Sequence, residues 1–97
     1  MSPEEKEAKI NRAEKFCVKL RRATFDDTDL LNVIEDIIYA LCIRLPDPDR
    51  DYWENAFNYV KHDNKIAYRD ERENFKELVI ALLQMLSDYK DFIREHE

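Results

Sequence analysis

Acidic and tyrosine side chains at helical spacing are the first candidates for function in this chain of 97 residues. Glu35, Asp36 and Tyr39 are separated by one and three residues, and Ile43 follows four residues later, so all four lie on one face of a helix. Such a face is typical of protein binding, because a tyrosine anchors a partner while the carboxylates select its charge. The alternative is a solvated face on which a neighbouring helix covers Tyr39 and Ile43.

A second group of acids and tyrosines follows two prolines. Asp49 and Tyr52 lie three residues apart, and Tyr59 comes seven residues after Tyr52, which is about two helical turns along the same face. The tyrosines would extend an acidic cluster with aromatic anchors for a partner. Aspartate at a helix start is also explained by the helix dipole alone, which favours negative charge there. The two tyrosine groups are alternatives, because packing could bury one of them.

A basic stripe forms the third candidate surface. Arg12, Lys15, Lys19 and Arg22 are spaced by three, four and three residues, which places them along one side of a helix. The solvated face of an amphipathic helix explains such a stripe without any ligand. As a functional surface, the stripe would bind an anion or nucleotide, or the acidic face of a second copy of this chain.

The residue types that most catalytic and cofactor motifs need are missing. Without glycine, the chain cannot form a phosphate-binding loop, a dinucleotide-binding fingerprint or a nucleophile elbow. His62 and His96 lack the carboxylate three residues earlier that a di-iron bundle requires. Cys17 and Cys42 lie at core-like positions of separate predicted helices, so we expect two reduced, buried thiols, with a disulfide as the alternative. They have no C-x-x-C spacing, which disfavours a zinc site. We therefore expect no enzyme activity, no metal and no cofactor.

The absence of glycine also indicates the fold class, because tight β-hairpin turns commonly require it. With only three prolines and 39% charged residues, the sequence predicts an all-α protein. Apolar periodicity predicts one domain of four helices, over residues 3–23, 27–45, 48–61 and 70–95. We expect an antiparallel four-helix bundle in which the second and fourth helices are central.

Capping residues set the expected starts of the first three helices. Ser2 is the expected cap of the first helix, because it precedes a proline and lies three residues before a glutamate. Asp26 or Asp27 is the expected cap of the second helix, and Asp47 that of the third.

The end of the third helix and the start of the fourth depend on weaker signals. Residues 62–64 are the expected frayed end of the third helix, since asparagine tolerates a C-terminal cap conformation. Asp70 with Glu73 is the expected cap of the fourth helix. Residues 65–69 fit either a loop or an early helical turn.

The charge of the chain is distributed unevenly. Residues 1–22 carry seven basic and four acidic side chains, a net charge of +3, which leaves −9 on the remainder out of a total of −6. An acidic body disfavours direct nucleic-acid binding and favours a basic partner. The longest strictly apolar run, residues 79–83, is far shorter than the about 20 residues that span a bilayer. We therefore expect a soluble, cytoplasmic protein that does not engage membranes.

The combined expectation is a small acidic non-catalytic module that docks on a larger, basic protein and inhibits or adapts it. It is similar in size, charge and fold class to bacterial immunity proteins and phage-encoded inhibitors of defence systems. The expected contact residues are Glu35, Asp36, Tyr39, Asp49, Tyr52 and Tyr59. The runner-up is a self-assembling subunit of a homo-oligomer. Below it ranks an anion or nucleotide binder that uses the basic face of Arg12, Lys15, Lys19 and Arg22.

Overall fold

The computed structural model describes residues 1–67 and 72–96, and the side chains of residues 1–62 and 74–96. Every regular element in this part of the chain is a helix, so the predicted all-α class is confirmed. The elements in chain order are α1 (Pro3–Arg21), α2 (Leu30–Ile37), the π-helix η1 (Ile38–Cys42), α3 (Asp49–Ala67) and α4 (Arg72–Glu95). None of the described helices is both long and apolar enough to cross a bilayer.

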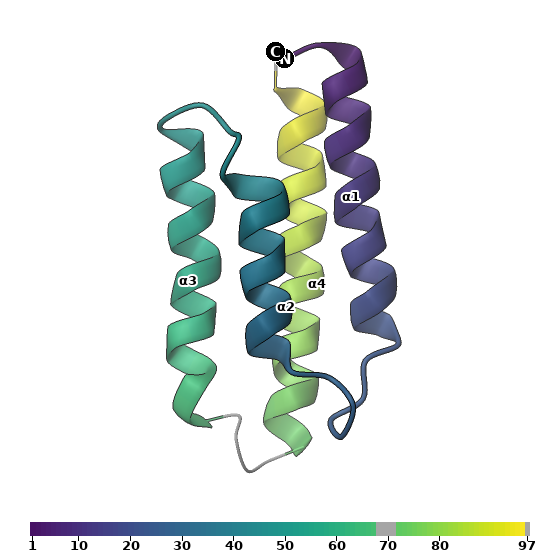
Figure 1. The fold of residues 1–97 in the computed structure, drawn as a ribbon, viewed down its shortest axis with the longest axis vertical. Helices are drawn as coiled ribbons and strands as arrows, with labels where there is room; N and C mark the ends of the chain where they lie inside the picture. The colour runs from purple at the N-terminus through teal and green to yellow at the C-terminus, as the bar shows by residue number, and fades with distance from the viewer. Residues whose placement is uncertain (68–71, 97) are drawn as a thin grey trace.

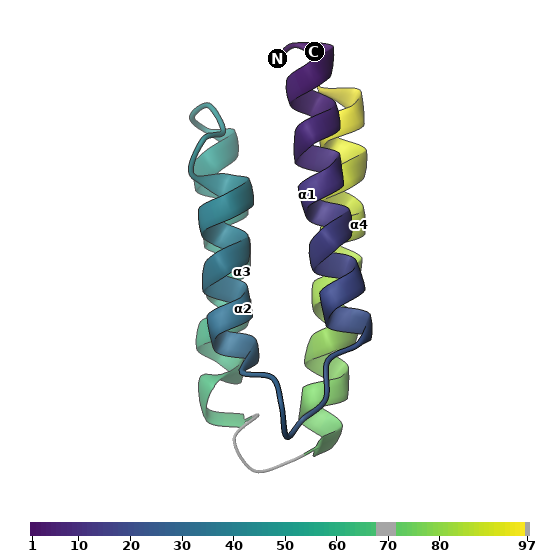
Figure 2. The same ribbon diagram turned by 45° about the vertical axis from the view of Figure 1, so that its right-hand side comes forward.

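The helices lie side by side in two pairs. Figure 1 shows the chain descending along α1, returning along α2 and η1, descending along α3 and returning along α4, with both termini at one end. In Figure 2, α1 lies beside α4 and α2 lies beside α3. The prediction that the second and fourth helices are central is therefore not confirmed.

One apolar core receives side chains from all four α-helices. Leu20 of α1, Ile34 of α2, Phe57 of α3 and Leu82 of α4 are each almost completely shielded from solvent. These positions belong to the apolar stripes that repeat every three or four residues in the sequence. Burying one such side chain contributes about 1.5–3 kcal/mol, so the stripes drive the assembly of the bundle.

The cap of α1 is as predicted, whereas the start of the second helix is not. The Ser2 hydroxyl accepts a hydrogen bond from the backbone N–H of Glu5 at 3.2 Å. The second helix begins at Leu30 rather than at residue 27, because Asp29 caps it by accepting the backbone N–H of Leu31 at 3.0 Å. The expectation of a cap at Asp26 or Asp27 was wrong: the Asp27 carboxylate accepts the hydroxyl of Thr24 at 2.9 Å within the preceding turn.

The boundaries of α3 also differ from the prediction. The helix begins at Asp49 rather than residue 48, and the carboxylate of the predicted cap, Asp47, forms an ion pair with Arg50. It continues through residues 62–64 to Ala67 instead of ending near residue 61. An asparagine tolerates a cap but does not require one, and its helix propensity is only a weak signal.

The described part of the fourth helix runs from Arg72 to Glu95, and its predicted start at residue 70 lies outside the described residues. The predicted cap at Asp70 lies outside the described residues, as does the side chain of its partner Glu73. The predicted apolar face of α4 begins at Phe75, which is buried in the core.

The second helix runs without a break from Leu30 to Cys42, shorter than the predicted 27–45, and it changes its winding. The α-helical hydrogen bonding of α2 gives way at Ile38 to the wider π-helical turn of η1, which ends at Cys42. Within this turn the backbone carbonyl of Leu41 accepts a hydrogen bond from the buried hydroxyl of Tyr89 at 2.8 Å. Burial raises the pKa of Tyr89, which keeps the hydroxyl protonated as the donor. A contact from α4 thus supports the backbone of η1.

Both cysteines are free thiols inside the core, as predicted. Cys17 of α1 and Cys42 of η1 are almost completely buried and form no disulfide. Burial raises the pKa of the Cys17 thiol, and it raises that of Cys42 to about 12. In these positions the two side chains behave as small apolar core residues.

Candidate functional site

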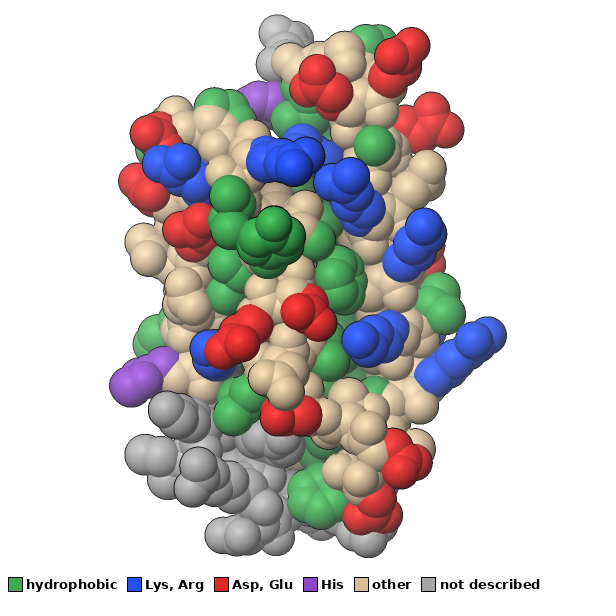
Figure 3. Space-filling view, in the orientation of Figure 1, with side chains coloured by type: hydrophobic (Ala, Val, Ile, Leu, Met, Phe, Trp, Pro, Cys, Tyr) green, Lys and Arg blue, Asp and Glu red, His purple; other side chains and the backbone are tan. Residues whose placement is uncertain are grey.

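An apolar pair lies on the outer face of η1 and the turn after it. Tyr39 is 75% exposed and Ile43, one helical turn later, is 44% exposed, so no neighbouring helix covers them. Together with Arg12, Ala40 and Arg44 they line a surface hollow of about 380 Å³. We call these five residues the Tyr39 surface. Figure 3 shows apolar side chains at the centre of this face, with basic side chains above them and acidic side chains below.

Two carboxylates of the predicted contact set, Glu35 and Asp36, lie one turn before Tyr39. Glu35 forms an ion pair with the ammonium group of Lys61, which reaches across from α3. Asp36 is exposed and forms no ion pair with any described residue. Asp36 therefore offers an uncompensated negative charge beside the Tyr39 surface.

The second predicted group lies on another side of the molecule. Tyr52 and Tyr59 are 67% and 70% exposed, whereas the Asp49 carboxylate lies 3.9 Å from Nδ1 of His96. Lys61 faces α2 through its ion pair. Nine residues at about 100° each place Tyr52 about 180° around α3 from Lys61. The structure therefore does not bring the two tyrosine groups into one surface.

The predicted basic stripe is exposed along α1 but divides into two parts. Arg12, Lys15, Lys19 and Arg22 all have exposed side chains. Arg12 lines two hollows that it shares with Arg44, which follows η1. Lys15 lines a separate surface hollow of about 420 Å³ on the solvent-exposed face of α1. Arg12 thus belongs to a junction between elements, and the other three residues belong to a solvated helix face.

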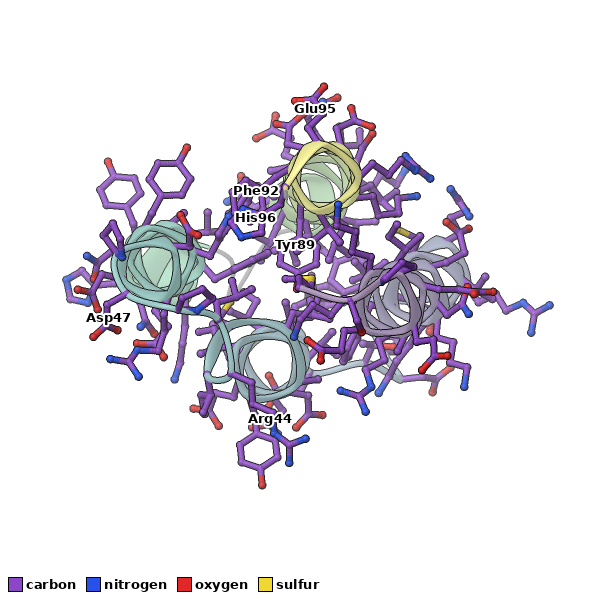
Figure 4. The ribbon with its side chains drawn as sticks, turned by 90° about the horizontal axis from the view of Figure 1, so that it is seen from above. Arg44, Asp47, Tyr89, Phe92, Glu95 and His96 are labelled. Atoms are coloured by element: carbon purple, nitrogen blue, oxygen red, sulfur yellow. The ribbon has the colours of Figure 1, made fainter. Side chains whose placement is uncertain are left out.

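A cleft rich in positive charge lies at the end of the bundle that carries both termini. Its volume is about 390 Å³, and we call it the basic cleft. Its lining residues are Met1, Glu5, Ala8, Lys9, Arg12, Arg44, Pro46 and His96. Figure 4 looks onto this end of the bundle and shows Arg44 on the side of η1 and His96 beside Phe92 of α4.

Two cations of the basic cleft were absent from the predicted site residues. Lys9 precedes Arg12 by three residues, so the helical spacing of the stripe could have identified it. Arg44 lies 32 positions after Arg12 and joins it only through the packing of η1 on α1. No local pattern in the sequence indicates that Arg44 lies near Arg12.

An exposed apolar groove runs between the end of α1 and the first half of α4. Ile80 is 66% exposed at its edge, and Ala23, Phe75, Val79 and Leu83 contribute to its walls. The volume of the groove is about 380 Å³. The basic side chains of Arg21 and Lys76 also line this groove.

The described residues contain no group of three or more side chains placed to hold a metal ion. Of the two histidines, His62 is exposed on α3, and His96 lies against Asp49 and the ring of Phe92. Comparison of the chain with protein-family models, curated proteins and solved structures gave no match. Its function must therefore be inferred from surface chemistry.

Proposed function

We propose that this chain is a non-catalytic protein-binding module, an antiparallel helical bundle that docks through the Tyr39 surface on a larger, basic protein and inhibits or adapts it. The observation that carries the proposal is the pair Tyr39 and Ile43. Among the described residues, they are the large apolar side chains that are exposed within one helical turn of each other. Exposed aromatic and aliphatic groups bordered by charge are typical of the anchors of protein interfaces.

The backbone beneath this pair has support from the core. Leu41, which lies between Tyr39 and Ile43 in the sequence, accepts the buried hydrogen bond from Tyr89. A surface that is held in place before binding loses less conformational entropy when a partner docks. π-helical turns occur frequently at functional sites, which fits a contact role for η1.

The surrounding charges define the partner that would fit. Asp36 has no ion pair among the described residues and lies on one side of Tyr39, while Arg12 and Arg44 lie on the other. A complementary partner would place a basic group near Asp36 and an apolar side chain against Tyr39. The net charge of −6 would attract a basic protein over longer distances.

The test is affinity capture from the native host with quantitative mass spectrometry, using the wild-type chain, Tyr39→Ala and Tyr59→Ala. Each variant removes one exposed tyrosine, so Tyr59→Ala controls for general loss of aromatic surface. We expect a partner that wild type and Tyr59→Ala retain and Tyr39→Ala loses. If Tyr39→Ala removes a hot spot, the binding free energy falls by about 2 kcal/mol and the affinity by about 30-fold. The proposal fails if no captured protein depends on Tyr39, and loss through Tyr59→Ala alone would assign binding to α3.

Self-assembly is the second candidate, and the exposed Ile80 groove is the observation that favours it. The discriminating measurement is the sedimentation mass at low and high salt. An oligomer held by charge should dissociate in high salt or when Lys15 and Lys19 are both changed to Glu. An oligomer held by the groove should survive both conditions and dissociate in Ile80→Glu. A monomer under all conditions would exclude this candidate.

A further inference from the structure

The basic cleft holds three cations that come from two separate elements. Lys9 and Arg12 lie one turn apart on α1, and Arg44 approaches from the turn after η1. Among the described residues, none of these three side chains forms an ion pair with a carboxylate. The cleft is therefore a concentration of positive charge on a chain whose net charge is −6.

Among the described residues, Glu5 is the carboxylate that lines the basic cleft, and it offsets only part of this charge. Lys9 is half-buried there, and desolvation, followed by the nearby charge of Arg12, lowers its pKa. Arg44 lowers this pKa further, whereas Glu5 raises it. A bound anion would supply the missing counter-charge and would favour the charged form of Lys9.

We propose that the basic cleft binds the phosphate group of a small molecule as a dianion. Among the described side chains, three cations against one carboxylate leave an excess of two positive charges, which matches a phosphate dianion better than a single carboxylate. The planar guanidinium groups of Arg12 and Arg44 are suited to paired hydrogen bonds with phosphate oxygens. Inorganic phosphate and a phosphate monoester present the same chemistry to the cleft.

The size and walls of the cleft are consistent with a ligand of this class. Its volume of about 390 Å³ lies within the range of about 300–1,000 Å³ that is common for small-molecule sites. Met1 and Pro46 provide apolar wall against which the body of an ester could pack. His96 also lines the cleft but lies near Asp49, so it is not counted among the three phosphate-binding cations.

The test is calorimetric titration of the full chain at constant ionic strength and about pH 8, where phosphate is largely a dianion. The probes are inorganic phosphate, glycerol 3-phosphate and, as a monoanion control, acetate. We expect saturable binding of one phosphate per chain and much weaker binding of acetate. Equal affinity for the two phosphates would indicate recognition of the group alone, and tighter binding of the ester would indicate contact with its body; both results support the proposal.

Matched variants separate the cleft from general positive charge. Lys9→Gln and Arg12→Gln each remove one charge inside the cleft. Lys19→Gln and Arg22→Gln are the matched controls, because each removes the same type of charge at an exposed position outside the cleft. Arg44→Gln tests the contribution of the second element. Loss of one charge-assisted hydrogen bond should weaken phosphate binding about tenfold in each cleft variant, while the two control variants stay within about twofold.

Three results would overturn the proposal. These are no saturable binding of either phosphate by the wild-type chain, acetate binding as tightly as phosphate, and equal losses in Lys9→Gln and Lys19→Gln. Far-UV circular dichroism and a thermal melt of each variant establish that a loss of binding is not a loss of fold. Tyr39 does not line the basic cleft, so Tyr39→Ala should bind phosphate like the wild type. The protein-binding proposal depends on Tyr39, and the two proposals can therefore fail independently.

Discussion

At the scale of single residues, Tyr89 connects the core to the surface. Its ring is fully buried and lies edge-on to Trp53, with 5.3 Å between ring centroids, while its hydroxyl donates to the Leu41 carbonyl. A buried carbonyl that loses its donor is costly, because no water replaces the bond. This one hydroxyl therefore influences the backbone on which Tyr39 is placed.

Tyr89→Phe removes that hydrogen bond and keeps the aromatic ring. We expect the free energy of unfolding to fall by about 1–3 kcal/mol, the usual cost of leaving one buried polar group without a partner. Urea denaturation followed by circular dichroism measures the change. Tyr59→Phe removes an exposed hydroxyl and serves as the control, with an expected change within about 0.5 kcal/mol. Equal stability of Tyr89→Phe and wild type would contradict the structural role of the bond.

The buried thiols give a second prediction at this scale. Since the thiolate is the reactive form, the raised pKa values of Cys17 and Cys42 should make both react slowly with a thiol reagent in the folded protein. A raised pKa favours the folded state below the unfolded value of 9.0, and this contribution is lost as the pH rises towards about 12. Labelling at about pH 8 should therefore follow the rate of unfolding with increasing urea. Rapid stoichiometric labelling without denaturant would show that the thiols are accessible.

At the scale of elements, apolar periodicity predicted the existence of four helices, and local chemistry did not place all their ends. Several aspartates precede Leu30, and each is a residue type that can cap a helix. In the structure Asp29 caps α2, and Asp27 is bound to Thr24 in the preceding turn. The π-helical winding of η1 involves a hydrogen bond from Tyr89, 48 residues later. Such features depend on tertiary contacts, which a pattern within one segment cannot reveal.

Glu14 links α1 to α4 and should make their association depend on pH. Its carboxylate accepts hydrogen bonds from Lys90 of α4 at 2.7 Å and from Arg21 at 3.3 Å. The bond from Lys90, followed by that from Arg21, lowers the pKa of Glu14 below its ordinary value of 4.5. A lowered pKa stabilises the folded state above that value, and the contribution is lost as the pH falls through the folded pKa.

Glu14→Gln should therefore melt at a lower temperature than wild type at neutral pH, and the difference should shrink in acid. Thermal melts between about pH 7 and pH 3 measure this convergence. Glu7→Gln is the control, because it removes a charge from the same helix at a position without an ion pair among the described residues. A difference between Glu14→Gln and wild type that persists unchanged into acid would show that the link does not act through the ionised carboxylate.

At the scale of the whole molecule, the sequence predicted the chemistry of the surface better than its geometry. Helical spacing grouped Glu35, Asp36 and Tyr39 on one face, and the structure shows Tyr39 exposed there. The same spacing could not show that Arg12 and Arg44 would border Tyr39, because they come from different elements. The charges expected beside Tyr39 and Ile43 were all acidic, whereas the structure places both signs of charge around this apolar pair.

Because this surface combines charge with an apolar anchor, we expect separate effects on the association rate and the dissociation rate of a partner. Asp36→Lys should slow association with a basic partner and flatten its salt dependence, because it weakens long-range attraction. Tyr39→Ala should instead raise the dissociation rate, since it removes a short-range anchor. Surface plasmon resonance over a range of salt concentrations measures both rates.

Glu77→Lys is the matched control for the effect of charge. It makes a charge change of the same size at an exposed position on α4. In the end-on view, α4 lies across the bundle from α2 and η1 (Figure 4). Screening over about 8 Å at physiological salt means that a charge so placed should affect association less than Asp36 does. If Asp36→Lys and Glu77→Lys slow association equally, attraction depends on net charge alone. If neither Asp36→Lys nor Tyr39→Ala alters binding and charge reversal at Lys15 and Lys19 abolishes it, the basic face of α1 is the docking surface.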